Sequence, residues 1–220
     1  MAVIFNWLNL CILKPLCTKR GCKGIHRYER WFEWQLKLAD LFGGADLMII
    51  GDSNAEVFCK RKVLNNSTKI ILTFGVGGTT IYDWVEYFYF NSEIYDKISM
   101  DNKLEIVFNI GGNNILRSQM PAVESGFKML KGLFPRSWNC TVPPLRYQWL
   151  AAISGIPCES WKEDVKIVND HIHQIWKRQA IDLYSLIYNL PGDVKNLCLK
   201  DAVHYSDFAV RYIFKCLRYI

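Results

Sequence analysis

The sequence predicts an α/β fold, a three-layer α/β/α sandwich around a central, mainly parallel five-stranded sheet. Three observations carry this prediction. Short apolar runs recur along the chain, and amphipathic stretches with helical periodicity separate them. Within the runs at residues 70–72 and 106–108 the apolar residues are continuous, as is typical of parallel strands buried on both faces. Strands that alternate with helices favour right-handed crossovers and a sheet covered on both sides.

Each expected strand is a short apolar run. The five runs cover residues 46–50, 68–74, 104–110, 139–142 and 180–184. Strands of this length and spacing leave room for one helix in most of the connections, as a parallel sheet requires.

Helices are expected where apolar residues recur every three or four positions. The first precedes the strand at 46–50, and its apolar face carries Trp31, Trp34, Leu38 and Leu41. A second precedes the strand at 180–184, and its face carries Trp161, Val165, Val168, Ile172 and Ile175. The last helix is expected to begin near Ser206, whose hydroxyl can cap it, and to run through Phe208, Tyr212 and Phe214.

The stretch at residues 145–160 has neither a strand nor a helix prediction. It follows Pro143 and Pro144 and is rich in Tyr and Trp. Such a segment can form the wall of a binding pocket or pack into the core, and the sequence leaves both interpretations open.

Composition predicts one folded domain. The chain has 220 residues, of which 50% are hydrophobic and 22% charged, so it can bury a sizeable core and is not disordered. The net charge of +6 is mild, and the basic residues are scattered apart from the run at 60–62, so no nucleic-acid partner is expected.

The first 26 residues are interpreted as an N-terminal extension that contains cysteines. The apolar stretch at 2–13 is shorter than the ~20 residues of a membrane span, so no transmembrane segment is expected. It also lacks the basic start and the small-residue cleavage site of a signal peptide, which favours a cytoplasmic location. Packing on the domain and contact with a membrane surface or partner stay open for this stretch.

Eight cysteines show no regular disulfide framework, and a domain of this size does not need one. Cys11, Cys17, Cys22 and His26 have zinc-compatible types and gaps, loosely similar to a CCCH zinc finger, but apolar residues fill the first gap and favour unpaired structural thiols. No metal site is therefore assigned. His171 and His173 are two residues apart on an expected helix and point to different faces, so they form no metal pair.

Four segments follow strands in the order expected of a shared site. Ser53 lies in 51–54 after the first strand, and glycine-rich segments at 74–80 and 109–114 follow the second and third. Asp201 and His204 come after the last strand. Because ligands of open parallel sheets bind beyond the carboxyl ends of the strands, these four segments are expected to meet at one edge.

These residues resemble the four sequence blocks of the GDSL/SGNH hydrolases. Gly51-Asp52-Ser53 is similar to the nucleophile block, 75–80 to the glycine block, 111–114 to the Gly-x-Asn-Asp block and 201–206 to the terminal Asp-x-x-His block. The resemblance spans residues 46–220 and implies a flavodoxin-like SGNH fold, with residues 27–220 as the catalytic domain. Asn54 stands where the motif has leucine, at a position that varies in the family, and Asn114 stands where aspartate is usual.

The resemblance also implies roles that the chemistry supports. Ser53 is expected to be the nucleophile, His204 the general base and acid, and Asp201 the carboxylate that orients the imidazole. The backbone N–H groups of Ser53 and Gly78 and the side-chain amide of Asn113 are expected to form an oxyanion hole. Asp52 is expected to hydrogen-bond within the turn. The mechanism implies no cofactor.

The implied reaction is hydrolysis of an ester of a small acyl group, with O-acetyl sugars and lipids as the candidate substrates. Two alternatives stay open: a non-catalytic binding or partner module on the same fold, and a nucleic-acid-associated protein with a zinc-binding N-terminal segment. The sequence contains no Gly-x-Ser-x-Gly motif, which argues against the α/β-hydrolase fold.

Overall fold

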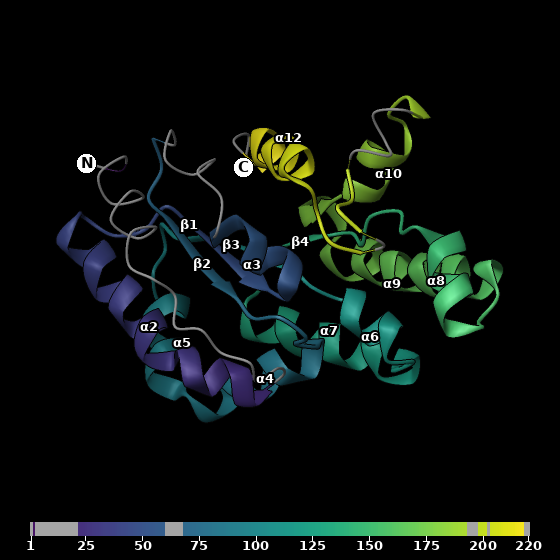
Figure 1. The fold of residues 1–220 in the computed structure, drawn as a ribbon. Helices are drawn as coiled ribbons and strands as arrows, with labels where there is room; N and C mark the ends of the chain where they lie inside the picture. Colours follow the sequence, from purple (N-terminus) through teal and green to yellow (C-terminus); the bar gives the residue numbers. More distant parts are fainter. Residues whose placement is uncertain (1, 3–21, 60–67, 193–197, 202, 218–220) are drawn as a thin grey trace.

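A five-stranded parallel sheet in the order β2-β1-β3-β4-β5 forms the centre of the computed structural model (Figure 1). The structure describes residue 2 and residues 22–59, 68–192, 198–201 and 203–217. The strands are β1 (Leu47–Gly51), β2 (Ile71–Gly75), β3 (Glu105–Asn109), β4 (Trp138–Cys140) and β5 (Ala180–Ile181). The predicted fold class, a three-layer α/β/α sandwich with a parallel five-stranded sheet, is confirmed.

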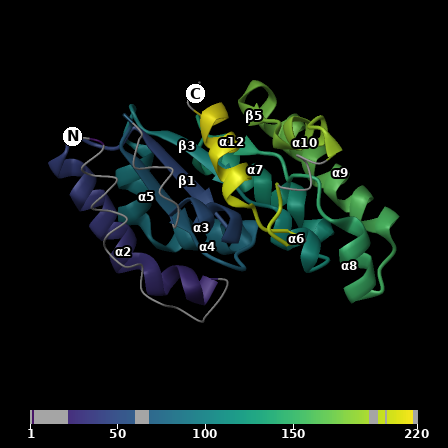
Figure 2. The same ribbon diagram turned by 45° about the horizontal axis from the view of Figure 1, so that its top comes forward.

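Helices fill the connections between the strands. They are α2 (Cys22–Leu41), α3 (Ser53–Cys59), α4 (Ile81–Phe90), α5 (Ser92–Ser99), α6 (Gly112–Leu116), α7 (Val123–Leu133), α8 (Tyr147–Ser154), α9 (Cys158–Trp176), α10 (Leu183–Tyr188) and α12 (Asp207–Leu217), with 3₁₀ turns η2 (Met120–Ala122) and η3 (Lys177–Gln179). The helices α2 and α8 lie at opposite ends of the molecule (Figure 2).

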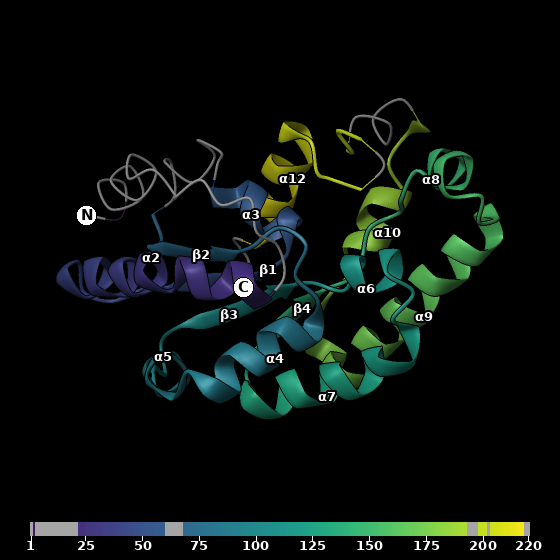
Figure 3. The ribbon, with the colours of Figure 1, turned by 60° about the horizontal axis from the view of Figure 1, so that its bottom comes forward.

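The sheet separates two apolar cores, because successive side chains of a strand point to opposite faces. On β1, Met48 and Ile50 pack against residues of α2, α4, α5, α7 and α9. Leu47 and Ile49 pack on the other face, against α3, α10 and α12. Figure 3 shows α3 and α12 on one side of the strands and α4 and α7 on the other.

The helix before β1 differs in part from the sequence prediction. Trp31 is buried in the core, and Trp34 and Leu38 pack against it half-buried, as expected. Leu41 is 82% exposed, so its predicted place on the buried face is wrong. It is the last residue of α2, before the turn through Gly43 and Gly44 that leads into β1. The expected boundary between residues 26 and 27 falls within α2 and stays a prediction.

Two further expectations are corrected. The strand expected at 180–184 ends at Ile181, because the Asp182 side chain accepts a hydrogen bond from Ser185 N at 3.0 Å and caps α10. The unassigned stretch at 145–160 contains α8, which ends at Gly155 with φ of +73°. Leu150 is the fully buried residue of α8, so the helix shows little apolar periodicity.

The helix face of α9 and the start of the last helix agree with the sequence prediction. Trp161, Val165, Val168 and Ile172 are buried in α9, and Ile175 packs against the same core. Ser206 Oγ accepts the Ala209 N–H at 3.2 Å at the start of α12. In the described part of the chain, no helix has both the length and the apolar character that crossing a membrane requires.

Candidate active site

Ser53 lies at the point where β1 ends and α3 begins. The turn before it is tight: a Cβ on Gly51 would lie 2.0 Å from the backbone oxygen of Asn109 on the neighbouring strand β3. Gly51 therefore permits β1 and β3 to approach at their carboxyl ends. The sequence placed Ser53 at this edge of the sheet, and the structure agrees.

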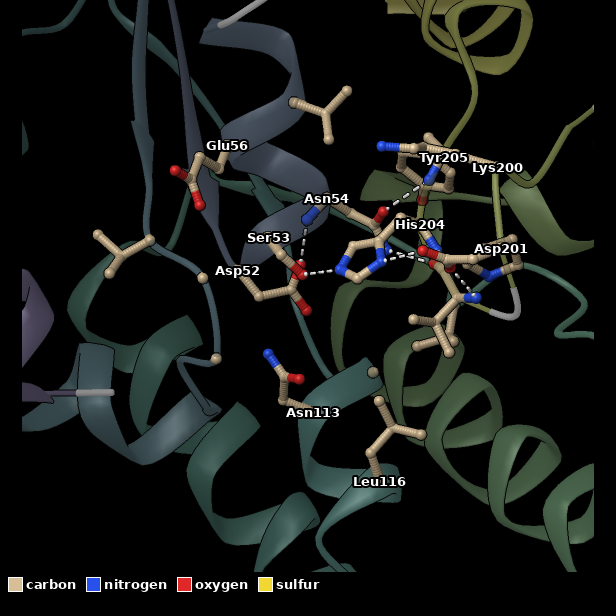
Figure 4. A pocket seen from close by; sticks show the side chains of 18 of the residues that line it. Asp52, Ser53, Asn54, Glu56, Asn113, Leu116, Lys200, Asp201, His204 and Tyr205 are labelled. Carbon is tan, nitrogen blue, oxygen red and sulfur yellow. Dashed lines mark hydrogen bonds and ion pairs between the residues drawn. The ribbon is translucent and has the colours of Figure 1, made fainter. Parts of the chain in front are cut away.

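Ser53, His204 and Asp201 form a continuous chain of hydrogen bonds (Figure 4). His204 Nε2 lies 3.0 Å from Ser53 Oγ, and His204 Nδ1 lies 2.8 Å from Asp201 Oδ2. The second oxygen of Asp201 accepts the backbone N–H groups of Val203 and His204, each at 2.9 Å. The structure thus brings together three residues, of which Ser53 and His204 are 151 positions apart in the sequence.

The surroundings of Asp201 favour its ionised form. Partial burial raises the pKa of the carboxyl, but the N–H groups of Val203 and His204 and the His204 ring outweigh it and hold the pKa below its ordinary value. A carboxylate beside Nδ1 fixes a tautomer in which Nε2 is free to accept a proton from Ser53.

Asp52 is buried next to Ser53, with 4% of its surface exposed. Burial raises the pKa of its carboxyl to about 6, although the N–H groups of Asn54 and Ala55 and the charge of His204 oppose the shift. Its Oδ1 accepts the Asn54 N–H at 2.8 Å, which is the turn bond expected from the sequence. The raised pKa depends on three-dimensional burial and has no sequence signal.

The glycine segment after β2 approaches the turn that holds Ser53. Gly78 has φ of +76°, a left-handed conformation that favours glycine, and its carbonyl accepts a bond from the Arg117 guanidinium at 2.7 Å. The Trp84 indole N–H donates to Gly51 O at 3.2 Å, which ties α4 to the end of β1. Thr80 caps α4 through a reciprocal bond with Asp83.

Asn113 and Asn114 have different surroundings on α6. Asn113 lines the cavity beside Ser53, and its Nδ2 donates to Thr79 O at 2.9 Å (Figure 4). Asn114 is fully buried, and its Oδ1 accepts the Ile81 N–H at 3.1 Å at the start of α4. The amide at the position usually held by aspartate therefore anchors the helix that follows the glycine segment.

The assembled residues border a cavity of about 880 Å³. Ser53, His204, Gly78 and Asn113 line it together with apolar side chains, among them Leu116, Val142 and Leu145. Leu145 belongs to the stretch at 145–160, for which the sequence left two interpretations open, a pocket wall or a part of the core. Leu145 both lines the cavity and packs in the core. Trp149 in the same stretch is half-exposed.

Several lining residues had no signal in the sequence. Glu56 lies on α3, and Lys200 and Tyr205 flank the Asp201 and His204 loop. Asn54 was noted as a departure from the usual pattern and also lines the cavity. Their part in the site follows from the packing of α3 against this loop, which a linear pattern does not encode.

The described residues contain no cluster of three or more His, Cys, Asp and Glu side chains placed to hold a metal ion. Cys11 and Cys17 lie outside the described residues, so the structure does not test the alternative of a zinc-binding N-terminal segment. His171 is half-buried and His173 exposed, in agreement with their expected place on different faces of α9.

No protein-family model matches the sequence, and a comparison with curated proteins found no match. Solved structures do match over most of the chain. A GDSL-like lipase from Bacteroides thetaiotaomicron is 15% identical with a TM-score of 0.60, and the match covers 90% of this chain and 98% of the lipase.

Two further solved structures are similar to this chain over most of its length. A Streptococcus pneumoniae protein proposed to be a platelet activating factor is 14% identical with a TM-score of 0.59, covering 88% of this chain and 96% of that one. An acetyl-xylooligosaccharide esterase from Geobacillus is 15% identical with a TM-score of 0.52, covering 78% and 90%. The resemblance to GDSL/SGNH hydrolases is confirmed at the level of the fold: the chain has the SGNH hydrolase fold.

Proposed function

We propose that the protein is a serine hydrolase that cleaves carboxylic esters through an acyl-enzyme intermediate. One observation carries the proposal: Ser53, His204 and Asp201 are linked at 3.0 and 2.8 Å beside a cavity large enough for a small ester. Residues 27–220 would form the catalytic domain.

The Ser53 hydroxyl needs a base, because an alcohol is a poor nucleophile at neutral pH. In the proposed mechanism His204 Nε2 takes the Ser53 proton as Oγ attacks the ester carbonyl, and later gives it to the leaving alcohol. The ionised Asp201 carboxylate stabilises the imidazolium formed in between. A water molecule activated by His204 then releases the acyl group and regenerates Ser53.

The negative oxygen of the tetrahedral intermediate needs hydrogen-bond donors. We assign this role to the backbone N–H groups of Ser53 and Gly78 and to the Asn113 amide. An amide nitrogen carries two N–H groups, so Asn113 can donate to Thr79 O and to the substrate oxygen together. One such donor is worth about 3 kcal/mol of transition-state stabilisation.

We propose a small acyl ester, such as an O-acetylated sugar, as the substrate class. The apolar residues that line the cavity can surround a short acyl group, and Glu56 and Lys200 add polar groups at its border. The match to an acetyl-xylooligosaccharide esterase agrees with this choice.

The function is tested with Ser53→Ala and His204→Ala on p-nitrophenyl acetate, butyrate and palmitate. The wild type should turn over the acetate fastest and react with a fluorophosphonate at Ser53. Each variant should lose at least about 10³-fold in kcat, because the triad residues act as a unit. Circular dichroism should show that both variants stay folded.

Equal turnover by the wild type and Ser53→Ala, or a wild type that a fluorophosphonate does not label, would rule out the serine-hydrolase mechanism. Faster cleavage of the palmitate than of the acetate would contradict the small-acyl assignment and leave the mechanism standing.

A further inference from the structure

Asn54 directly follows Ser53, and its side chain reaches across to the loop that carries His204. Its Nδ2 donates to Val203 O at 3.1 Å, and its Oδ1 accepts the Tyr205 N–H at 2.9 Å (Figure 4). The two bonded groups belong to the residues on either side of His204. One side-chain amide therefore brackets the histidine from both sides.

We propose that Asn54 is a positioning residue that holds His204 at hydrogen-bonding distance from Ser53 Oγ. This inference rests on the proposed function, since it assigns the means by which base and nucleophile are kept together. The two reacting side chains come from segments about 150 residues apart, so their separation depends on bonds that join those segments.

Apart from the bond to Ser53 and a long bond of 3.4 Å from the Tyr205 hydroxyl to Asn109 Oδ1 at the end of β3, the other bonds around His204 lie within its own loop. Asp201 Oδ1 accepts the N–H groups of Val203 and His204, and the Lys200 N–H donates to His204 O at 2.8 Å. These bonds set the shape of the loop, but they do not fix its distance from β1 and α3. The two Asn54 bonds do, because Asn54 belongs to the turn that carries Ser53.

Both ends of the bracket are themselves fixed. The Asn54 N–H donates to the buried Asp52 carboxyl at 2.8 Å, so the backbone that carries the amide is held in the turn. Tyr205 is fully buried, and its side chain packs among residues of α3, α10 and α12. Asn54 therefore connects two anchored segments, and its substitution would change the distance between Ser53 Oγ and His204 Nε2.

The bracket is a property of this chain's own sequence. The GDSL motif has leucine at the position of Asn54, which varies in the family, and a leucine side chain has no polar atom for either bond. Asn54→Leu keeps a similar volume and removes both bonds, and Asn54→Asp keeps the acceptor for Tyr205 N–H while it removes the donor to Val203 O.

Activity and hydrogen exchange of these variants test the inference. With p-nitrophenyl acetate, Asn54→Leu should lower kcat about 10- to 100-fold with KM within about twofold, because a displacement near 1 Å at a reacting group costs about that much. The kcat of Asn54→Asp should lie between those of the wild type and Asn54→Leu. Fluorophosphonate labelling of Ser53 should slow by the same factor as kcat.

Gln35→Leu is the matched control. Gln35 also pairs both amide atoms with one backbone segment, donating to Thr73 O at 3.4 Å and accepting Thr73 N–H at 3.3 Å. It is buried on α2, outside the cavity. Its loss should lower the melting temperature at least as much as Asn54→Leu does, while kcat stays unchanged.

Amide hydrogen exchange gives a readout that does not depend on turnover. The Tyr205 N–H should exchange at least about 10-fold faster in Asn54→Leu than in the wild type, and equally fast in Gln35→Leu. The inference would be overturned if the wild type is active and Asn54→Leu has the same kcat. It would also be overturned if the Tyr205 N–H exchanges equally fast in Asn54→Leu and in the wild type. A wild type inactive on every ester would refute the proposed function, and exchange at Tyr205 would still decide whether the bracket exists.

Discussion

Asp52 is a buried carboxyl group beside the proposed nucleophile, and its pKa makes it a source of pH-dependent stability. Burial raises that pKa from 3.8 to about 6. Between these two values the folded protein binds more protons than the unfolded chain, so this carboxyl lowers the free energy of unfolding as pH rises through the window. The full shift corresponds to about 3 kcal/mol.

We therefore predict that Asp52→Asn has a flatter stability profile than the wild type. From pH 7.5 to pH 5, the wild type should gain about 1 kcal/mol of unfolding free energy relative to the variant, because Asp52 becomes protonated in the folded state. Urea unfolding at both pH values measures the difference. Asp201, whose pKa lies below its ordinary value, is ionised in both states over this range and does not interfere. A constant difference between the two proteins would show that Asp52 does not titrate in the window.

At the scale of single elements, Asn169 attaches α9 to the loop that follows β4. Its Oδ1 accepts the Val142 N–H at 2.7 Å, and its Nδ2 donates to Val142 O at 2.9 Å. Both residues are buried. Asn169→Leu would leave two buried backbone groups of Val142 unpaired, and each such group costs about 1–3 kcal/mol.

Asn169→Leu should therefore lower the free energy of unfolding by about 2–4 kcal/mol in urea titrations. The neighbouring Asp170→Asn is the control, since Asp170 is exposed and pairs with Lys166 at the surface. Its effect should stay below about 1 kcal/mol. Equal effects of the two substitutions would mean that the Asn169 pairing adds nothing to the attachment of α9.

The elements that the sequence predicted well are those with strong apolar patterns. The continuous runs of β1, β2 and β3 are buried on both faces, the serine segment and the two glycine segments follow them in order, and the histidine segment follows β5. β5 and α8 were predicted poorly for physical reasons. Asp182 stops β5 after two residues by capping α10, and α8 buries chiefly Leu150. The two Asn54 hydrogen bonds and the burial of Asp52 arise from contacts between segments far apart in the sequence, and no local sequence pattern predicts such contacts.

At the scale of the whole molecule, the sheet divides the protein into two cores, and the candidate site draws on both. Gly78 and Asn113 border elements of the face that carries α4 and α7. His204 lies in the loop that leads into α12, which packs on the opposite face with α3. The geometry at Ser53 therefore depends on both faces staying folded together.

Two buried cysteines lie in the core on the α3 and α12 face, and they report whether that face unfolds together with the rest of the molecule. Cys140 lies on β4 with 2% of its surface exposed, and Cys198 lies just before the His204 loop with 0% exposed. Burial raises the pKa of the Cys198 thiol, which slows its reaction with alkylating agents further. Cys158, at the start of α9, is partly exposed and should react in the native protein.

We predict that N-ethylmaleimide, followed by peptide mapping, labels Cys158 at least about 10³-fold faster than Cys140 and Cys198 in the absence of urea. As urea rises, both buried thiols should become reactive at the midpoint at which circular dichroism is lost, because the shared sheet couples the two cores. If both thiols react at a clearly lower urea concentration than the circular dichroism midpoint, the face that holds α3 and α12 opens by itself. The proposed esterase activity would then disappear before the fold does, since His204 leaves Ser53 when that face opens.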